Sequence, residues 1–131
     1  MSEFELSNLG DAPEARAPDG SRVRALLRTQ GGSMAHFELE PGACSKAVAH
    51  HRVEELWFVL SGCGELWRAH NGREEISALA PGTCFSIRAG CHFQFRASQE
   101  ASLKVVAVTM PPWPGPDEAY AVKGTWTEDP G

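Results

Sequence analysis

The sequence predicts an all-β domain, either a sandwich or a barrel, built from many short strands. From residue 21 to residue 110, short runs of β-like composition alternate with turn signals such as Asn71-Gly72 and Pro81-Gly82. The chain contains 13 glycines and 9 prolines, which favours many turns over long helices. Its 131 residues fit one domain that can bury a full core.

Nine strands follow in order, each bounded by turn residues. Asn71-Gly72 predicts a tight hairpin, because both residues tolerate a positive φ. Residues 105–108 are continuously apolar and are typical of a central strand. The expected strands are Val23–Thr29, Met34–Leu39, Ala47–His51, Leu56–Leu60, Glu65–Arg68, Ile76–Leu79, Thr83–Arg88, His92–Arg96 and Leu103–Met110.

The predicted strands divide the chain into three parts. Residues 1–20 are acidic, contain two prolines, and are expected to form an N-terminal arm. Residues 21–110 are expected to form the barrel. Residues 111–131 begin with a proline-rich run that ends the sheet, because proline cannot donate to a strand ladder. This C-terminal segment keeps Trp113, Tyr120 and Trp126, so we expect it to pack on the barrel or on a partner subunit.

Composition excludes several classes of function. A net charge of −5 argues against nucleic-acid binding, which needs a basic face. There is no signal-peptide pattern at the start and no apolar run of the ~20 residues that a membrane span needs. The four cysteines lack zinc-finger spacing, so we expect a cytoplasmic protein with reduced, mostly buried thiols. No phosphate-binding loop is present, and no nucleotide or organic cofactor is predicted.

The run from Gly42 to Gly62 carries the chemistry-bearing residues. His50 and His51 precede the carboxylates Glu54 and Glu55, and an apolar strand follows. Imidazoles and a carboxylate that converge can bind a divalent metal or move a proton. The same residues are also common as polar groups at a strand end.

Two segments of the chain resemble the motifs of the cupin superfamily. The first motif, G-x5-H-x-H-x(3–4)-E-x6-G, is matched by Gly42, His50, Glu55 and Gly62, and the second is framed by Gly82 and Gly90. The resemblance covers about residues 34–110. It implies a single-domain jelly-roll β-barrel that forms a homodimer and binds a small molecule.

Four positions depart from the family motifs. Val48 stands where the first ligand histidine is expected, and Phe93 stands where the second motif has its histidine. Arg88 replaces a proline and Ala97 an asparagine. The resemblance therefore implies a degenerate ligand set of His50, Glu55 and His92 for a divalent Fe, Mn, Ni or Zn ion, with His51 as the alternative third ligand. A metal-free pocket is the other interpretation.

Strand alternation separates the two glutamates. Glu55 shares a face with Trp57 and Val59, and Glu54 shares the other with the remaining apolar side chains. If Glu55 faces the barrel interior, burial raises its pKa and makes it a general acid or base, together with His50. We expect the substrate pocket to be lined by Trp57, Arg88, His92, Phe93 and Gln94.

The resemblance favours a small-molecule-binding cupin, with two alternatives for what it does. One is an oxygenase, isomerase, cyclase or lyase acting on a small organic or sugar-like substrate. The other is a metal-free module that binds or senses a ligand without turnover. The four aspartates lie outside the predicted barrel strands and no G-x-S-x-G elbow occurs, which disfavours serine-hydrolase chemistry. His36 and His70 are expected to face water.

Overall fold

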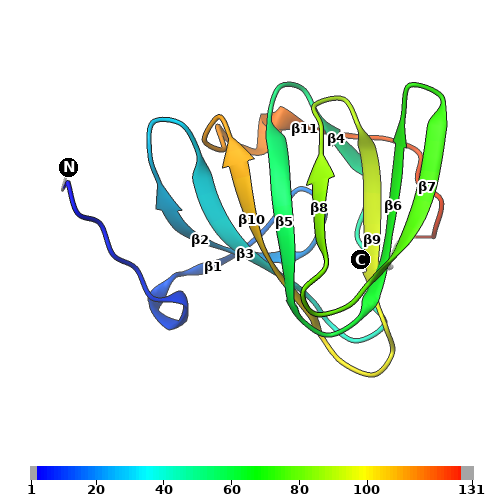
Figure 1. The fold of residues 1–131 in the computed structure, drawn as a ribbon, viewed down its shortest axis with the longest axis horizontal. Helices are drawn as coiled ribbons and strands as arrows, with labels where there is room; N and C mark the ends of the chain where they lie inside the picture. The colour runs from blue at the N-terminus through cyan, green and yellow to red at the C-terminus, as the bar shows by residue number, and fades with distance from the viewer. Residues whose placement is uncertain (1–2, 128–131) are drawn as a thin grey trace.

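The computed structural model describes residues 3–127 and consists of two antiparallel sheets packed face to face (Figure 1). This confirms the predicted all-β jelly-roll fold. The six-stranded sheet has the order β1 (Glu14–Arg16), β2 (Arg22–Arg28), β3 (Ser33–Leu39), β10 (Leu103–Met110), β5 (Glu54–Ser61), β8 (Cys84–Ile87). The five-stranded sheet has the order β11 (Ala119–Ala121), β4 (Val48–His50), β9 (His92–Ala97), β6 (Gly64–His70), β7 (Arg73–Leu79).

All nine predicted strands are present, most with ends shifted by one to three residues. Two further strands, β1 and β11, and two short 3-10 helices, η1 (Leu9–Asp11) and η2 (Pro116–Glu118), were not predicted. The predicted hairpin joins β6 to β7, where Asn71 and Gly72 have φ values of 51° and 78°. No helix among residues 3–127 is long and apolar enough to cross a membrane.

The core lies between the two sheets and is rich in aromatic side chains. Alternation along β5 buries Glu55, Trp57 and Val59 and exposes Glu54, Leu56 and Phe58, as predicted. The Trp57 ring stacks on Phe37 with centroids 5.2 Å apart, and it also contacts Phe85, Phe93 and Phe95. This cluster fills the middle of the barrel.

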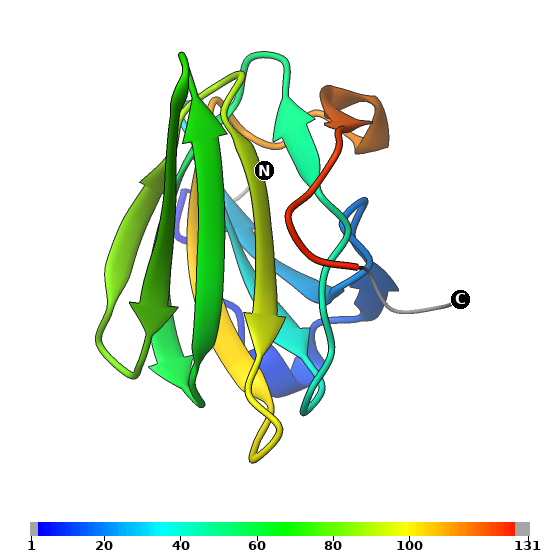
Figure 2. The ribbon, with the colours of Figure 1, turned by 90° about the vertical axis from the view of Figure 1, so that its right-hand side faces the viewer.

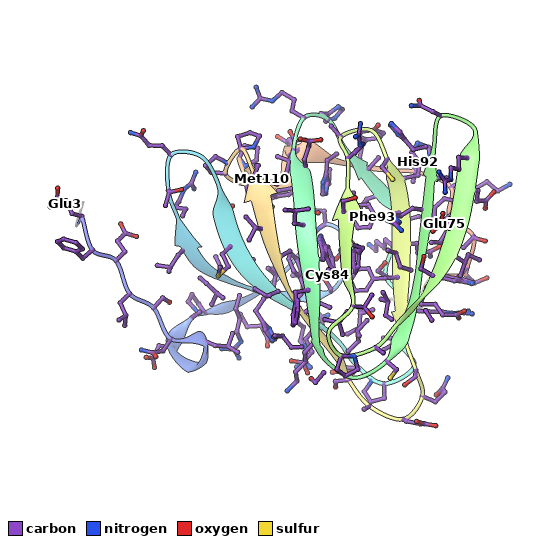
Figure 3. All side chains as sticks on the ribbon, in the orientation of Figure 1. Glu3, Glu75, Cys84, His92, Phe93 and Met110 are labelled. Atoms are coloured by element: carbon purple, nitrogen blue, oxygen red, sulfur yellow. The ribbon has the colours of Figure 1, made fainter. Side chains whose placement is uncertain are left out.

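The C-terminal segment lies on the barrel beside β4 (Figure 2). β11 pairs with β4. The side-chain amide of Gln94 then holds residues 125 and 126 by hydrogen bonds. Gln94 Nε2 donates to the carbonyl oxygens of Ser45 and Trp126, and its Oε1 accepts from the backbone N–H groups of Thr125 and Trp126. The N-terminal arm instead projects away from the barrel before β1, with Glu3 near its outer end (Figures 1 and 3).

The structure corrects the expectations for three side chains, Cys63, Cys84 and His36, and adds an observation about Asp19. Cys63 and Cys84 are exposed rather than buried, because they lie at a strand connection and on the outer face of β8. His36 is 6% exposed rather than facing water; it lies between Arg24 of β2 and Val106 of β10 in the sheet. Asp19 is 5% exposed although it belongs to a turn outside the predicted barrel strands.

We predict that Gly62→Ala strongly destabilises the fold, by more than about 3 kcal/mol. Gly62 has a φ of +79°, and a Cβ there would lie 2.1 Å from the carbonyl oxygen of Ser102. Gly82→Ala is the matched control, because Gly82 has a φ of +91° with open space around it. The control carries only the conformational penalty, about 1 kcal/mol. Urea unfolding measures both, and equal losses in the two variants would contradict the steric argument.

Candidate functional site

His50 and Glu55 meet at one end of the barrel interior. His50 is the last residue of β4, Glu55 is the second residue of β5, and the short connection between them reverses the chain. His50 Nδ1 lies 3.6 Å from Glu55 Oε1, and the two side chains are only 5% and 3% exposed. A histidine and a carboxyl group are therefore paired in a nearly dry environment.

Burial controls the protonation of Glu55. Its removal from water raises the pKa to about 8, and the negative field of Asp19 adds to this rise. Trp57 acts in the opposite direction, since its indole Nε1 donates a 3.3 Å hydrogen bond to Glu55 Oε1. At neutral pH Glu55 is consequently for the most part a neutral carboxylic acid that can donate a proton.

Burial has the opposite consequence for His50. It lowers the pKa to about 4, although the carboxylate of Glu118 partly offsets the effect. The imidazole packs edge-on against Phe93 and Trp113, with ring centroids 5.4 and 5.1 Å away. Nδ1 is buried and has no hydrogen-bond partner. His50 is therefore a neutral base with a free ring nitrogen directed towards Glu55, and the contact between the two is not an ion pair at pH 7.

The C-terminal segment packs on this end of the barrel, and its contacts with the His50 region were not predicted from the sequence. The half-buried Trp113 covers His50, and its backbone N–H donates to Ser33 Oγ. Glu118 accepts hydrogen bonds from the backbone N–H groups of Arg52 and Val53. Burial acts to raise the pKa of Glu118, but these bonds outweigh it and the pKa is lowered.

Asp19 is a second buried carboxyl group that the sequence analysis missed. Its side chain accepts hydrogen bonds from the backbone N–H and the hydroxyl of Ser21, at 2.9 and 2.6 Å. Burial raises its pKa, and it is near enough to Glu55 to raise that pKa as well. The only sequence signal was the spacing Asp-Gly-Ser, which fits an Asx turn but does not indicate burial.

The structure does not bring the other predicted residues to Glu55. On β9, Phe93 and Phe95 enter the core, so His92 and Gln94 lie on the opposite face of the strand. Gln94 is occupied by the C-terminal segment instead. Figure 3 labels His92 and Phe93 on this strand.

His51 and Arg88 lie in separate surroundings. His51 is exposed, with its ring 4.5 Å from that of Tyr120, because the residue after His50 faces the other way. Arg88 is exposed at the rim of a cavity outside the His50–Glu55 pair. Of the predicted site residues, His50, Glu55, Trp57 and Phe93 are the ones that come together.

The donor set does not fit a three-ligand metal centre. His50 and Glu55 supply two donors, but no group of three His, Cys, Asp or Glu side chains within residues 3–127 is arranged to hold a metal ion. Val48 and Phe93 pair across β4 and β9 and are both buried core residues without donor atoms. The side chains at this end of the barrel suit proton exchange better than metal coordination.

Comparison of the sequence with protein-family models identifies the family of this chain. The model of the cupin domain matches residues 35–109, which is more than half of the chain and runs from within β3 to within β10. The chain belongs to the cupin family. A comparison with curated protein sequences gave no significant match.

Solved structures similar to this cupin share its fold at low sequence identity. Oxalate decarboxylase from Bacillus subtilis is 15% identical with a TM-score of 0.77; the match covers 93% of this chain but 33% of that one, so this cupin spans about a third of that protein. KdgF from Halomonas sp. is 16% identical with a TM-score of 0.70, over 85% and 96% of the two chains. The Streptomyces nucleoside dehydratase Pac13 is 10% identical with a TM-score of 0.73, over 93% and 92%.

We predict that Glu55→Gln stabilises this cupin at pH 8 and leaves its stability nearly unchanged at pH 4.5. The folded-state pKa of Glu55 is raised to about 8 from 4.5, so its contribution is complete below pH 4.5 and is lost as the pH rises to 8. The difference between variant and wild type should grow by about 3–5 kcal/mol across that window.

Urea unfolding at a series of pH values measures this difference. Glu54→Gln is the matched control, because Glu54 is the adjacent glutamate and is exposed. Its difference from wild type should stay flat with pH. A Glu55→Gln variant with the same pH dependence as wild type would show that Glu55 is not a neutral buried acid.

Proposed function

We propose that this cupin is a small-molecule enzyme of lyase or isomerase type, in which Glu55 is the general acid and His50 the general base. The observation that carries the proposal is the buried pair itself. Glu55 keeps its proton and His50 remains neutral at pH 7, so one group is ready to donate and the other to accept. Pairs of titratable groups whose pKa values are driven apart by their environment are typical of acid–base catalysis.

The pair can carry a complete elimination without an external acid or base. Glu55 donates its proton to a departing hydroxyl group, which leaves as water, and His50 Nδ1 accepts the proton from the adjacent carbon as the double bond forms. The imidazolium then returns its proton to the Glu55 carboxylate across the 3.6 Å that separates them. An isomerisation uses the same two transfers with no leaving group.

Two of the similar structures are consistent with proton-transfer chemistry on this fold. One is named a decarboxylase and another a nucleoside dehydratase. Dehydration needs a proton on the leaving oxygen, and decarboxylation replaces a carboxyl group with a proton. Because identity is only 10–15%, these names support the reaction type and not a substrate.

Access to the pair requires a movement, since both side chains are almost fully buried. Trp113 is the cover that can move, because its ring lies on His50 and belongs to an irregular segment between β10 and η2. Its indole also offers an aromatic surface to a planar substrate. In this proposal, displacement of Trp113 admits the substrate to His50 and Glu55.

The test uses oxalate and uridine as first probes, within a wider panel of small hydroxylated and carboxylated compounds. Binding is followed by NMR and turnover by product analysis. For any compound that is turned over, the rate should be constant between about pH 4 and pH 8 and fall outside that window, following the His50 and Glu55 pKa values. Glu55→Gln should lower the rate by about 10²–10⁴-fold, and Glu54→Gln should not.

The outcomes separate enzyme from binding module. A compound that binds wild type and Glu55→Gln alike, with no turnover by either, would favour the alternative of a ligand-binding or sensing cupin. Turnover that survives in Glu55→Gln with an unchanged pH profile would remove Glu55 as the acid.

We also propose that this cupin forms a homodimer through the outer face of its six-stranded sheet. Leu56, Phe58 and Leu60 on β5 are 53%, 43% and 46% exposed, and Met34 on the same face is 39% exposed. Met110 on β10 and Cys84 on β8, both labelled in Figure 3, extend this face. A continuous exposed apolar area of this kind favours association with a second copy.

We predict that Phe58→Lys shifts the dimer to a monomer, weakening association at least about 10-fold. A buried lysine at the centre of an apolar interface would lack a partner for its charge. Ile76→Lys is the matched control, because Ile76 is 52% exposed on β7 of the other sheet. Sedimentation velocity measures both, and a monomeric wild-type protein at micromolar concentration would contradict the proposal.

A further inference from the structure

A separate cavity of about 370 Å³ lies between the free edges of the two sheets. β7 is an edge of the five-stranded sheet and β8 an edge of the six-stranded sheet. The cavity is lined by residues of β6, β7 and β8 and of the turn after β8. Figure 1 labels both strands, and Figure 3 labels Glu75 of β7. None of the cavity residues belongs to the His50–Glu55 pair.

Positive charge dominates this cavity in an otherwise acidic chain. Arg68, Arg73 and Arg88 line it together with His70, and Glu75 is the single carboxylate. Three guanidinium groups against one carboxylate leave two net positive charges, whereas the whole chain has a net charge of −5. A concave positive region on an acidic protein concentrates anions from solution.

Side-chain alternation on β6 and β7 places four of these residues on the cavity. Leu66 on β6 enters the core, so Arg68 and His70 share its inward face beyond the apolar layer. Their cross-strand partners on β7 are Glu75 and Arg73. Arg68 is held in position, because its Nη1 donates to the carbonyl oxygen of Ser86 at 3.0 Å.

Among the three guanidinium groups, that of Arg88 is the one without a partner in the described residues. Arg68 and Arg73 both approach Glu75, at 3.8 and 3.0 Å. In the described part of the chain, the Arg88 side chain forms no hydrogen bond or ion pair. Its planar set of N–H donors matches the oxygens of a carboxylate or a phosphate.

We propose that this cavity is a binding site for the carboxylate or phosphate group of a small molecule, held by Arg88 with Arg68 and Arg73. Glu75 is an internal competitor that keeps part of the positive charge neutralised until the anion arrives. Cys91, the buried uncharged residue of the lining, adds no opposing charge. This site is independent of Glu55 catalysis, because it is defined by binding and not by turnover.

The test titrates the full-length protein with inorganic phosphate and, separately, with malonate, and follows backbone and arginine side-chain NMR signals. Sodium chloride at equal ionic strength is the reference for screening. We expect saturable shifts around residues 68–75 and 86–91 with a Kd of about 1 mM or tighter. Saturation by phosphate alone or malonate alone identifies which oxyanion the site recognises.

Three variants make the test specific. Arg88→Gln should weaken binding about 10-fold, since one charged donor set is lost. Glu75→Gln should tighten binding about 3-fold, because the competing carboxylate is removed. Arg28→Gln is the matched control, an exposed arginine at the end of β2, four strands away from β8, and should leave the Kd unchanged.

Two results would overturn the proposal. One is the absence of saturable shifts with both anions beyond the sodium chloride reference. The other is a Kd that Arg88→Gln and Glu75→Gln leave unchanged. Because Arg88 and Glu75 are exposed, both variants should fold, and this is checked by their NMR spectra. Loss of turnover in Glu55→Gln has no bearing on either result.

Discussion

The two-residue period of β5 is the constraint on which the site depends. Trp57 and Val59 must face inward to fill the barrel, and the same alternation carries Glu55 into the interior. A shift of one residue would expose the core face and bury the other, so the pairing of β5 with β10 and β8 is strongly fixed. The buried carboxyl group is thus a consequence of the same register that makes the core.

Aromatic packing then determines what kind of site the carboxyl group can form. Phe93 lies edge-on to both His50 and Trp57, and it occupies a position where the family motif has a donor. Such a ring excludes water and contributes no charge, so it favours the neutral forms of both titratable groups. A third charged or donor side chain at that position would instead have stabilised a charged state. A phenylalanine at this position therefore supplies no donor atom, and in the proposed mechanism it favours the neutral forms of His50 and Glu55.

The sequence predicted the strands and the inward face of β5 well, because both follow from local periodicity. It placed His92 and Gln94 in the pocket wrongly, since the family motif fixes spacing but the alternation on β9 assigns Phe93 to the core. The sequence could not place Asp19, Trp113 and Glu118 near His50 and Glu55, although Trp113 belongs to a segment that was expected to pack on the barrel. They reach the site through chain connections and the β11–β4 pairing, which depend on tertiary structure and leave no periodic signal.

The arginine-lined cavity and the His50–Glu55 pair lie at the same end of the barrel but do not share side chains. The backbone N–H of Gly90, in the turn that carries Arg88, donates a 2.8 Å hydrogen bond to the carbonyl oxygen of His50. Glu55 lies opposite Ile87, the residue before Arg88, in the β5–β8 ladder. Charge recognition in the interior would oppose the neutral forms that proton transfer needs. The arginines lie outside the aromatic layer. In the proposed site they would hold an anionic group near His50 and Glu55 while their own positive charges stay away from the pair. The pKa values that burial gives to His50 and Glu55 would then be preserved.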